Sequence, residues 1–225
     1  MGRFGWFGFN CGAMLSFNGK SATIGRVAVN TLLSSAMGGV VTMVIGRIQN
    51  RDSPYYKWNL GDLNNGILAG LVAVTGGCAF VQPWAAICIG TIASFIYKGA
   101  GALITHPKIR IDDPLDAVPV HCCCGLLGIF MPGFFAYPAY LDEVAVTAGR
   151  GGGAFYGYGA NLGIQCIEFL VIFGWTVAWA IVVFSIFLLI DKNKGSHAWF
   201  LIRGKQFEGI GFGLFFFFDS KVSAN

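Results

Sequence analysis

The feature of this sequence that most constrains its fold is the uneven spacing of its charged residues. Charged types make up only 12% of the 225 residues, about half the share of a typical soluble domain. They are bunched, and long apolar stretches with almost no charge separate the bunches. Because a helix needs about 20 apolar residues to cross a bilayer, this pattern predicts an all-α, polytopic bundle of transmembrane helices.

Six apolar segments follow one another along the chain: 4–17, 24–46, 63–80, 83–104, 114–137 and 162–190. The first is too short to cross a bilayer yet begins almost at the first residue. Truncation of a longer helix is the simplest explanation, and a re-entrant or interfacial segment is the alternative.

The connections between these segments also carry predictions. Val81 and Gln82 are expected to form a hairpin between two spans, with Pro83 in the first turn of the next helix, where its missing N–H costs nothing. A long external loop is expected over 138–161, with a flexible connection at its glycine-rich centre, 149–153.

Lysine and arginine predict the orientation of the chain in the membrane. If the N-terminus is cytoplasmic, 12 of the 15 basic residues lie on the cytoplasmic side, and only Lys20, Arg26 and Arg150 lie outside. The positive-inside rule then places both ends in the cytoplasm. Residues 1–190 are expected to form the membrane domain and 191–225 a cytoplasmic tail. The net charge of +4 forms no basic stripe, so no nucleic-acid partner is expected.

The seven cysteines are odd in number and three are consecutive, which does not fit a disulfide framework; they are expected to be small buried residues. Adjacent side chains on a helix point about 100° apart, so His121 and Cys122–Cys124 cannot converge on one metal ion. No metal or other cofactor is expected. No nucleophile–base constellation appears either, which disfavours an enzyme.

The segment from Asp112 to His121 is the richest in ionisable groups. Asp113-Pro114 predicts a helix start, with Asp113 as the N-cap and Pro114 at the first helical position. His121 would then lie seven to eight residues into the helix, roughly 12 Å deep and near mid-membrane. An ionisable group there costs about 2.5–3.5 kcal/mol and is a functional candidate; a hydrogen-bonded packing residue is the alternative.

Other polar residues receive simpler interpretations. Glu168 is expected one turn into the last span, near the outer face. Asparagines in or beside spans are expected to bond across helices, and the two remaining histidines to lie in solvated stretches. These residues are Asn30, Asn64 and Asn65, and His106 and His197.

Two motifs carry a resemblance to a known family. The stretch Gly5-Trp6-Phe7-Gly8-Phe9-Asn10 resembles the G-W-F/Y-G-F-N motif of the ammonium transporter family (Amt/Mep/Rh). Residues 112–121 resemble its D-D-P-x-(D/E)-x-x-x-x-H motif, and residues 63–73 and 77–86 match the family as well. The sequence is most similar to plant and protist ammonium transporters.

The resemblance implies an eleven-helix fold of two inverted five-helix repeats and a last long helix, of which this chain holds the C-terminal six. It implies a homotrimer in the plasma membrane that transports ammonium or ammonia through a histidine-lined apolar pore. In that pore Phe9 corresponds to the inner gate phenylalanine, Trp6 to a tryptophan beside the pathway and His121 to the second of two histidines. The first half is absent, so the chain alone is not expected to form a whole pore.

Two departures from the family pattern fall near these positions. Ala13 stands where the family usually has a serine that contacts the outer ion, and Cys122 where a glycine commonly follows the pore histidine. Three alternatives remain open: an ammonium sensor, a Rh-type gas channel and a non-functional fragment. The Asp-Asp-Pro and Phe-Asn motifs favour the Amt branch over the Rh branch.

Overall fold

The computed structural model describes residues 2–14, 17–53, 58–109, 113–145 and 151–194. Within these ranges the chain forms seven α-helices and no β-strand, as the predicted all-α class requires. A π-helical turn, Val118–Cys123, leads into α5, and a 3₁₀ turn, Ala154–Tyr156, precedes α7. The helices are α1 (Gly2–Gly12), α2 (Ser21–Gln49), α3 (Leu60–Thr75), α4 (Pro83–Ile104), α5 (Cys124–Phe135), α6 (Pro138–Ala145) and α7 (Ala160–Lys194).

Four helical stretches of the described chain are long and apolar enough to cross a membrane: Ser21–Gln49, Pro83–Ile104, Val118–Phe135 and Ala160–Ile190. The predicted segment 83–104 is confirmed to the residue, with Pro83 in the first turn. Two predicted segments are wrong in length, because α1 has 11 residues and α3 has 16. Predicted spans and observed helices still follow one another in the same order.

The connection between α3 and α4 is not the predicted two-residue hairpin. The helix α3 ends at Thr75, a run of turns comes next, and Val81 forms an isolated antiparallel bridge with Ala136. From α2, the Nδ2 atom of Asn30 donates to the carbonyls of Cys78 and Val81, at 2.9 and 2.8 Å. The turn is therefore buried and apolar, which is why its hydropathy resembles that of a helix.

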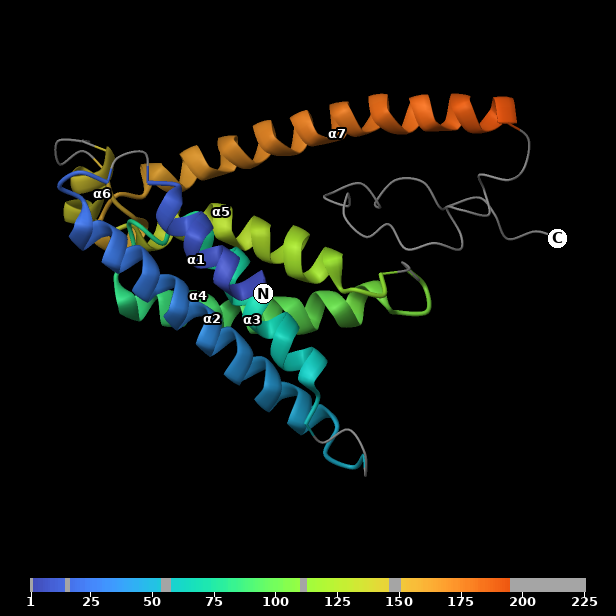
Figure 1. Cartoon of the computed structure of the whole chain (residues 1–225), viewed down its shortest axis with the longest axis horizontal. Coiled ribbons are helices and arrows are strands. Elements are labelled where there is room, and N and C mark those ends of the chain that lie inside the picture. Colours follow the sequence, from blue (N-terminus) through green and yellow to red (C-terminus); the bar gives the residue numbers. More distant parts are fainter. Residues whose placement is uncertain (1, 15–16, 54–57, 110–112, 146–150, 195–225) are drawn as a thin grey trace. The chain divides into compact units, whose positions relative to one another are not determined.

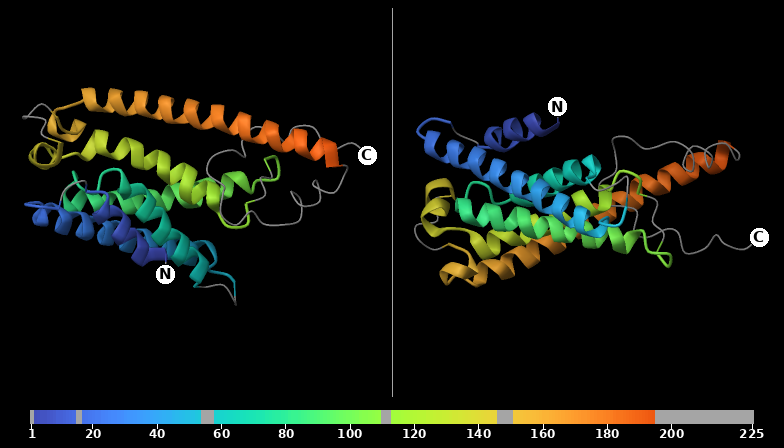
Figure 2. Two further views of the ribbon diagram at one scale, coloured as in Figure 1. Left: turned by 45° about the horizontal axis from the view of Figure 1, so that its top comes forward. Right: turned by 90° about the horizontal axis from the view of Figure 1, so that it is seen from below.

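Helices α2, α3 and α4 lie against one another (Figures 1 and 2), and small residues bring them close. A Cβ atom added to Gly70 of α3 would lie 2.3 Å from the carbonyl oxygen of Ser34, and one added to Gly90 of α4 would lie 2.2 Å from the same oxygen. Ser94 Oγ donates to the carbonyl of Gly38 at 2.9 Å. The three backbones thus meet directly, as is common where helices associate in a membrane.

The expected external loop over 138–161 contains α6 and the 3₁₀ turn. Its glycine-rich centre is not a flexible connection where the structure describes it, because Gly151, Gly152 and Gly153 are buried. Gly153 N donates to the carbonyl of Ala136 at 2.7 Å, and a Cβ atom on Gly153 would lie 2.2 Å from the carbonyl oxygen of Phe134. Here glycine permits close backbone approach; residues 146–150 lie outside the described ranges.

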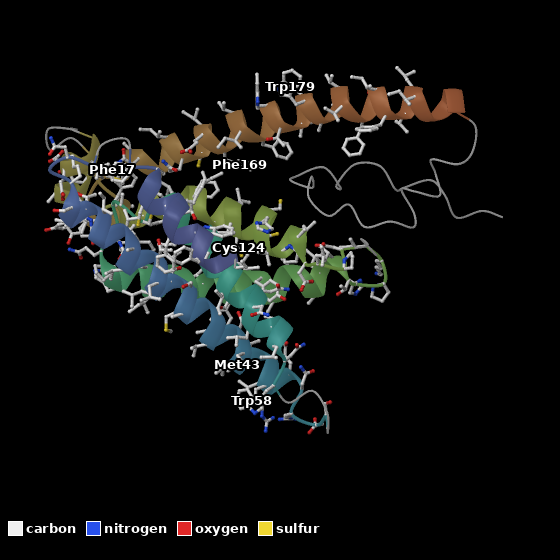
Figure 3. All side chains as sticks on the ribbon, viewed as in Figure 1. Phe17, Met43, Trp58, Cys124, Phe169 and Trp179 are labelled. Carbon is white, nitrogen blue, oxygen red and sulfur yellow. The ribbon has the colours of Figure 1, made fainter. Side chains whose placement is uncertain are left out.

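The chain divides into two compact units, Met1–Glu168 and Phe169–Asn225. The described part of the second unit is the remainder of α7, whose apolar side chains project on all sides (Figure 3). Trp179, for example, is 53% exposed. A helix that is apolar all round suits a lipid environment. It continues to Lys194, four residues beyond the predicted end of the span, and the later part of the predicted tail lies outside the described residues.

Candidate functional site

Trp6 joins α1 to the C-terminal end of α3. Its Nε1 atom donates to Oγ1 of Thr75 at 3.1 Å, and the Thr75 hydroxyl in turn donates to the carbonyl of Leu71 at 2.7 Å. The threonine hydroxyl thus acts as both acceptor and donor, which orients the indole. Phe9, three residues further along α1, is 65% exposed.

A pocket of about 550 Å³ lies between α3, α5 and the first turns of α7. Apolar groups of α3 and α5, including Val72, Gly125 and Ile129, form much of its wall. The polar side chains that reach it are those of Thr75, Asn161, Gln165 and Glu168. The pocket therefore combines an apolar wall with a few polar groups, which is the usual composition of a small-ligand site.

Glu168 is a polar wall residue of this pocket and lies eight residues into α7, deeper than the predicted single turn. With the amide of Gln165 oriented to satisfy its neighbours, Nε2 donates to Oε2 of Glu168 at 2.9 Å and to the carbonyl of Ile129. This contact holds the carboxylate at the pocket.

His121 lies in the π-helical turn and is partly buried. The helical backbone begins at Val118, with Ala117 as its N-cap, and not at Pro114 as predicted. His121 therefore lies about four residues from the helix start, a rise of about 6 Å, and not seven to eight residues as predicted; its depth in the membrane stays a prediction. Gly125, four residues further along the chain, belongs to the pocket wall, whereas His121 is not among the lining residues.

Asp113 bonds to the start of this helix from four and five residues earlier in the chain. Its two carboxylate oxygens accept hydrogen bonds from the backbone N–H groups of Ala117 and Val118, each at 2.8 Å. Asp113 thus supplies side-chain acceptors to the start of the helix, but the N-cap residue is Ala117, so the predicted N-cap position of Asp113 and the predicted position of Pro114 at the first helical residue are both wrong. Asp116, between Asp113 and the helix, has a left-handed backbone with φ of 54°.

Polar groups of three elements converge at Asp116. Its Oδ2 atom accepts hydrogen bonds from the Tyr97 hydroxyl of α4 at 2.8 Å and from Nδ2 of Asn65, on α3, at 2.9 Å. The predicted cross-helix bonding of Asn65 is confirmed. Close by in sequence, Lys98 Nζ lies 2.8 Å from Oδ2 of Asp62.

At the other end of the bundle, Arg26 connects α2 to α6. Its guanidinium lies 3.0 Å from Oε2 of Glu143 and 3.6 Å from the ring centroid of Tyr140, and its Nε donates to the carbonyl of Ala79 at 3.1 Å. The hydrogen bond from Thr23 and the charge of Arg26 hold the pKa of Glu143 below its usual value.

The cysteines and the remaining histidines partly follow the predictions. All seven cysteines are free, and Cys78 and Cys124 are buried as predicted, but the prediction is wrong for Cys122 and Cys166, which are exposed. His106 is exposed, and its Nδ1 accepts a hydrogen bond from Lys108 N at 3.3 Å. His197 lies outside the described residues.

Comparison with known proteins decides the family. Residues 3–194 match the model of the Ammonium Transporter Family. The chain is 35% identical over 202 residues to Ammonium transporter 1 member 1 of Arabidopsis thaliana, covering 85% of this chain and 38% of that protein. The chain belongs to the ammonium transporter family.

Solved structures of the family agree with this assignment. The crystal structure of Saccharomyces cerevisiae Mep2 has a TM-score of 0.67 and 29% identity, covering 84% of this chain and 39% of that one. A structure titled Sensor Amt Protein has a TM-score of 0.65 and 31% identity, covering 85% and 42%. The chain therefore has a partial ammonium transporter fold and spans about two fifths of the length of these relatives.

The predicted site residues differ in how they are connected to the pocket. None of Trp6, Phe9 and His121 is among the described lining residues of the pocket. Trp6 donates a hydrogen bond to the lining residue Thr75, and Gly125 of the wall comes four residues after His121. Sequence reasoning missed Thr75 and Gln165, because a single threonine or glutamine in an apolar stretch has no distinguishing pattern. Glu168 did carry a signal, as an ionisable group inside a predicted span.

Proposed function

We propose that this chain forms the C-terminal half of an ammonium pathway, with Trp6, Phe9 and His121 as pathway residues. One observation supports the proposal most directly. The pocket between α3 and α5 has Thr75, the hydrogen-bond partner of Trp6, and Gly125, which comes four residues after His121, among its lining residues. The pathway would run along the face formed by α3 and α5, and the N-terminal half found in the relatives would close it.

The chemistry of these groups suits ammonium. Aromatic faces attract a cation through their ring quadrupoles, which suits Trp6 beside the pathway and Phe9 at the inner gate. An apolar wall such as that of α3 and α5 penalises a bare cation far more than neutral ammonia. An imidazole such as His121 can donate or accept a hydrogen bond and can pass a proton.

Further parts of the proposal concern the whole protein. We propose a homotrimer in the plasma membrane, surrounded by lipid, with residues 1–190 in the membrane and 191–225 forming a tail. Both ends would be cytoplasmic, since this orientation gives the 12-to-3 distribution of basic residues. Ammonium or ammonia would be the substrate.

The test uses yeast that lacks its own ammonium uptake and is grown on low ammonium. The 225-residue chain is expressed alone, and it is also expressed joined to the N-terminal half of Ammonium transporter 1 member 1 of Arabidopsis thaliana. We expect growth with the joined protein only, because the chain alone leaves the pocket face of α3 and α5 open. Growth with the chain alone would contradict the half-pathway model. Absence of uptake by a joined protein that reaches the plasma membrane as a trimer would contradict transport.

The role of His121 is tested in the joined protein by His121→Ala, with His106→Ala as a matched control at an exposed histidine. Uptake is measured per folded trimer at the cell surface. We expect His121→Ala to lower uptake at least tenfold, or to change selectivity between ammonium and potassium, and His106→Ala to have no effect. Unchanged uptake and selectivity in His121→Ala would refute the pore role.

An ammonium sensor is the second candidate, because the Sensor Amt Protein has nearly the same similarity to this chain as Mep2. A sensor would bind ammonium without sustained uptake. In the joined protein, ammonium binding measured by calorimetry together with uptake at the level of the empty vector would favour the sensor.

A further inference from the structure

The turn that leads into the helix of His121 has an unusual backbone. Asp116 has φ of 54°, and it is the one residue other than glycine with a positive φ among the described residues. A left-handed conformation costs free energy for any residue with a Cβ atom, although aspartate and asparagine tolerate it better than most. Such a conformation persists only where the surrounding structure imposes it.

Two hydrogen bonds hold the side chain of Asp116, and a third joins the two donors. The Tyr97 hydroxyl and Asn65 Nδ2 both donate to Oδ2 of Asp116, at 2.8 and 2.9 Å, and Asn65 Nδ2 lies 3.3 Å from the Tyr97 hydroxyl oxygen. Tyr97 is only 4% exposed, so its hydroxyl is a fixed point in the core. The three side chains come from α3, α4 and the turn, and they form a closed triangle.

A π-helical turn comes directly after this triangle along the chain. It comprises Val118–Cys123, and His121 lies within it. A π-helix bonds residue i to i+5, so it is wider than an α-helix and sets a different angle between successive side chains. The direction in which His121 points therefore depends on where the π-helical turn begins. Asp113 fixes that start through the N–H groups of Ala117 and Val118, and Asp116 fixes the turn against α3 and α4.

We propose that Asp116 is a positioning residue for transport, which acts by accepting the hydrogen bonds of Tyr97 and Asn65 and thereby orients His121. The inference rests on the proposed pathway role of His121. It assigns Asp116 a role as a hydrogen-bond acceptor in a left-handed turn, for which its negative charge is not required. That distinction makes the proposal testable by conservative substitution.

Asp116→Asn is the decisive variant, because asparagine tolerates the left-handed backbone and its Oδ1 atom can still accept both bonds. Asp116→Gly adopts the left-handed backbone freely but has no side chain to accept a hydrogen bond. Asp116→Ala lacks the acceptor and also disfavours the left-handed backbone. In the joined protein we expect Asp116→Asn to keep uptake and ammonium-to-potassium selectivity within about twofold of the parent. Asp116→Gly and Asp116→Ala should each lower uptake per folded trimer at least tenfold or lower the selectivity.

Two results would overturn the proposal. Loss of uptake in Asp116→Asn equal to that in Asp116→Gly would show that the charge itself matters, and full uptake in all three variants would show that Asp116 positions nothing. If the Asp116 variants fail to accumulate, Tyr97→Phe and Asn65→Ala replace them, since each removes one hydrogen-bond donor to Asp116 and leaves the sequence of the turn unchanged. Their uptake or selectivity should fall by a smaller factor, and no change in either variant would also refute the proposal.

A second measurement on the 225-residue chain does not depend on transport. Cys122 and Cys124 flank the end of the π-helical turn; Cys122 is exposed, whereas Cys124 is buried with its Sγ 3.6 Å from the carbonyl of Ala93. Alkylation of each thiol is followed by mass spectrometry in detergent. We expect Asp116→Ala to raise the rate at Cys124 relative to Cys122 at least fivefold, and Asp116→Asn to leave the ratio unchanged. An unchanged ratio in Asp116→Ala would refute the positioning role even if the joined protein transported nothing.

Discussion

Lys98 of α4 and Asp62 of α3 form an ion pair with 2.8 Å between Nζ and Oδ2, and their side chains are only 17% and 12% exposed. A Cβ atom on Gly46 of α2 would lie 2.2 Å from the same Oδ2 atom. The pair is therefore enclosed by three helices at one end of the bundle. Removing one partner of such a pair leaves a charge without compensation in a poorly solvated site.

The first prediction concerns this pair. We expect Asp62→Asn and Lys98→Met each to lower the free energy of unfolding by about 3–5 kcal/mol, because each leaves one buried charge unpaired. The double variant should lose less than the sum, since neither charge remains. Reversible unfolding in mixed micelles measures all four proteins. A double variant whose loss equals the sum of the single losses would contradict the coupling.

A second prediction compares two glycines of α4. Gly90 faces the Ser34 carbonyl, whereas a Cβ atom on Gly99 would meet nothing within 4 Å. We expect Gly90→Ala to destabilise the chain by about 1–3 kcal/mol through overpacking. Gly99→Ala should stabilise it by up to about 1 kcal/mol through helix propensity. Thermal unfolding in detergent measures both, and equal effects of one sign would contradict the packing described.

The third prediction concerns acid stability. Hydrogen bonding from Thr23 and the charge of Arg26 lower the pKa of Glu143, so the contact stabilises the fold above the unfolded-state pKa of about 4.3. That contribution should be lost as the pH falls below about 4.3 and through the lower pKa of the folded state. The melting temperature of the parent chain should therefore drop more steeply over this range than that of Glu143→Gln. Parallel curves would exclude this contribution.

The fourth prediction tests orientation at two exposed positions. The side chain of Asp52 is 92% exposed and Phe155 is 67% exposed. In a background where the exposed Cys122 and Cys166 are replaced by serine, a membrane-impermeant maleimide applied to intact cells should label Phe155→Cys but not Asp52→Cys. The positive-inside rule predicts this result, because it places residue 155 outside the cell and residue 52 in the cytoplasm. Labelling of Asp52→Cys but not of Phe155→Cys would reverse the proposed topology.

Sequence predicts helices well where a local signal marks their ends. The bounds of α4 follow from Pro83 in the first turn and from the largely apolar run, interrupted by Lys98, up to Ile104. The end of α3 is not predictable in this way, because the buried turn after Thr75 is as apolar as a helix. Hydropathy reports burial and cannot by itself distinguish a buried turn from a buried helix.

The start of the helix that carries His121 escapes prediction for a different reason. Asp113-Pro114 is a common helix-start pattern, but here the chain passes through the left-handed Asp116 before helical bonding begins. That conformation depends on Tyr97 and Asn65, which lie 19 and 51 residues away in sequence. No local pattern contains such a tertiary contact, and the π-helical turn that comes after it is equally unpredictable.

The direct backbone contact of α2, α3 and α4 also bears on motion. Side chains at an ordinary interface can change rotamer and let two helices slide, but a carbonyl oxygen such as that of Ser34, set against Gly70 and Gly90, has no rotamer to change. Tightly packed interiors transmit displacement because they do not deform continuously. These three helices should therefore move together as one rigid body.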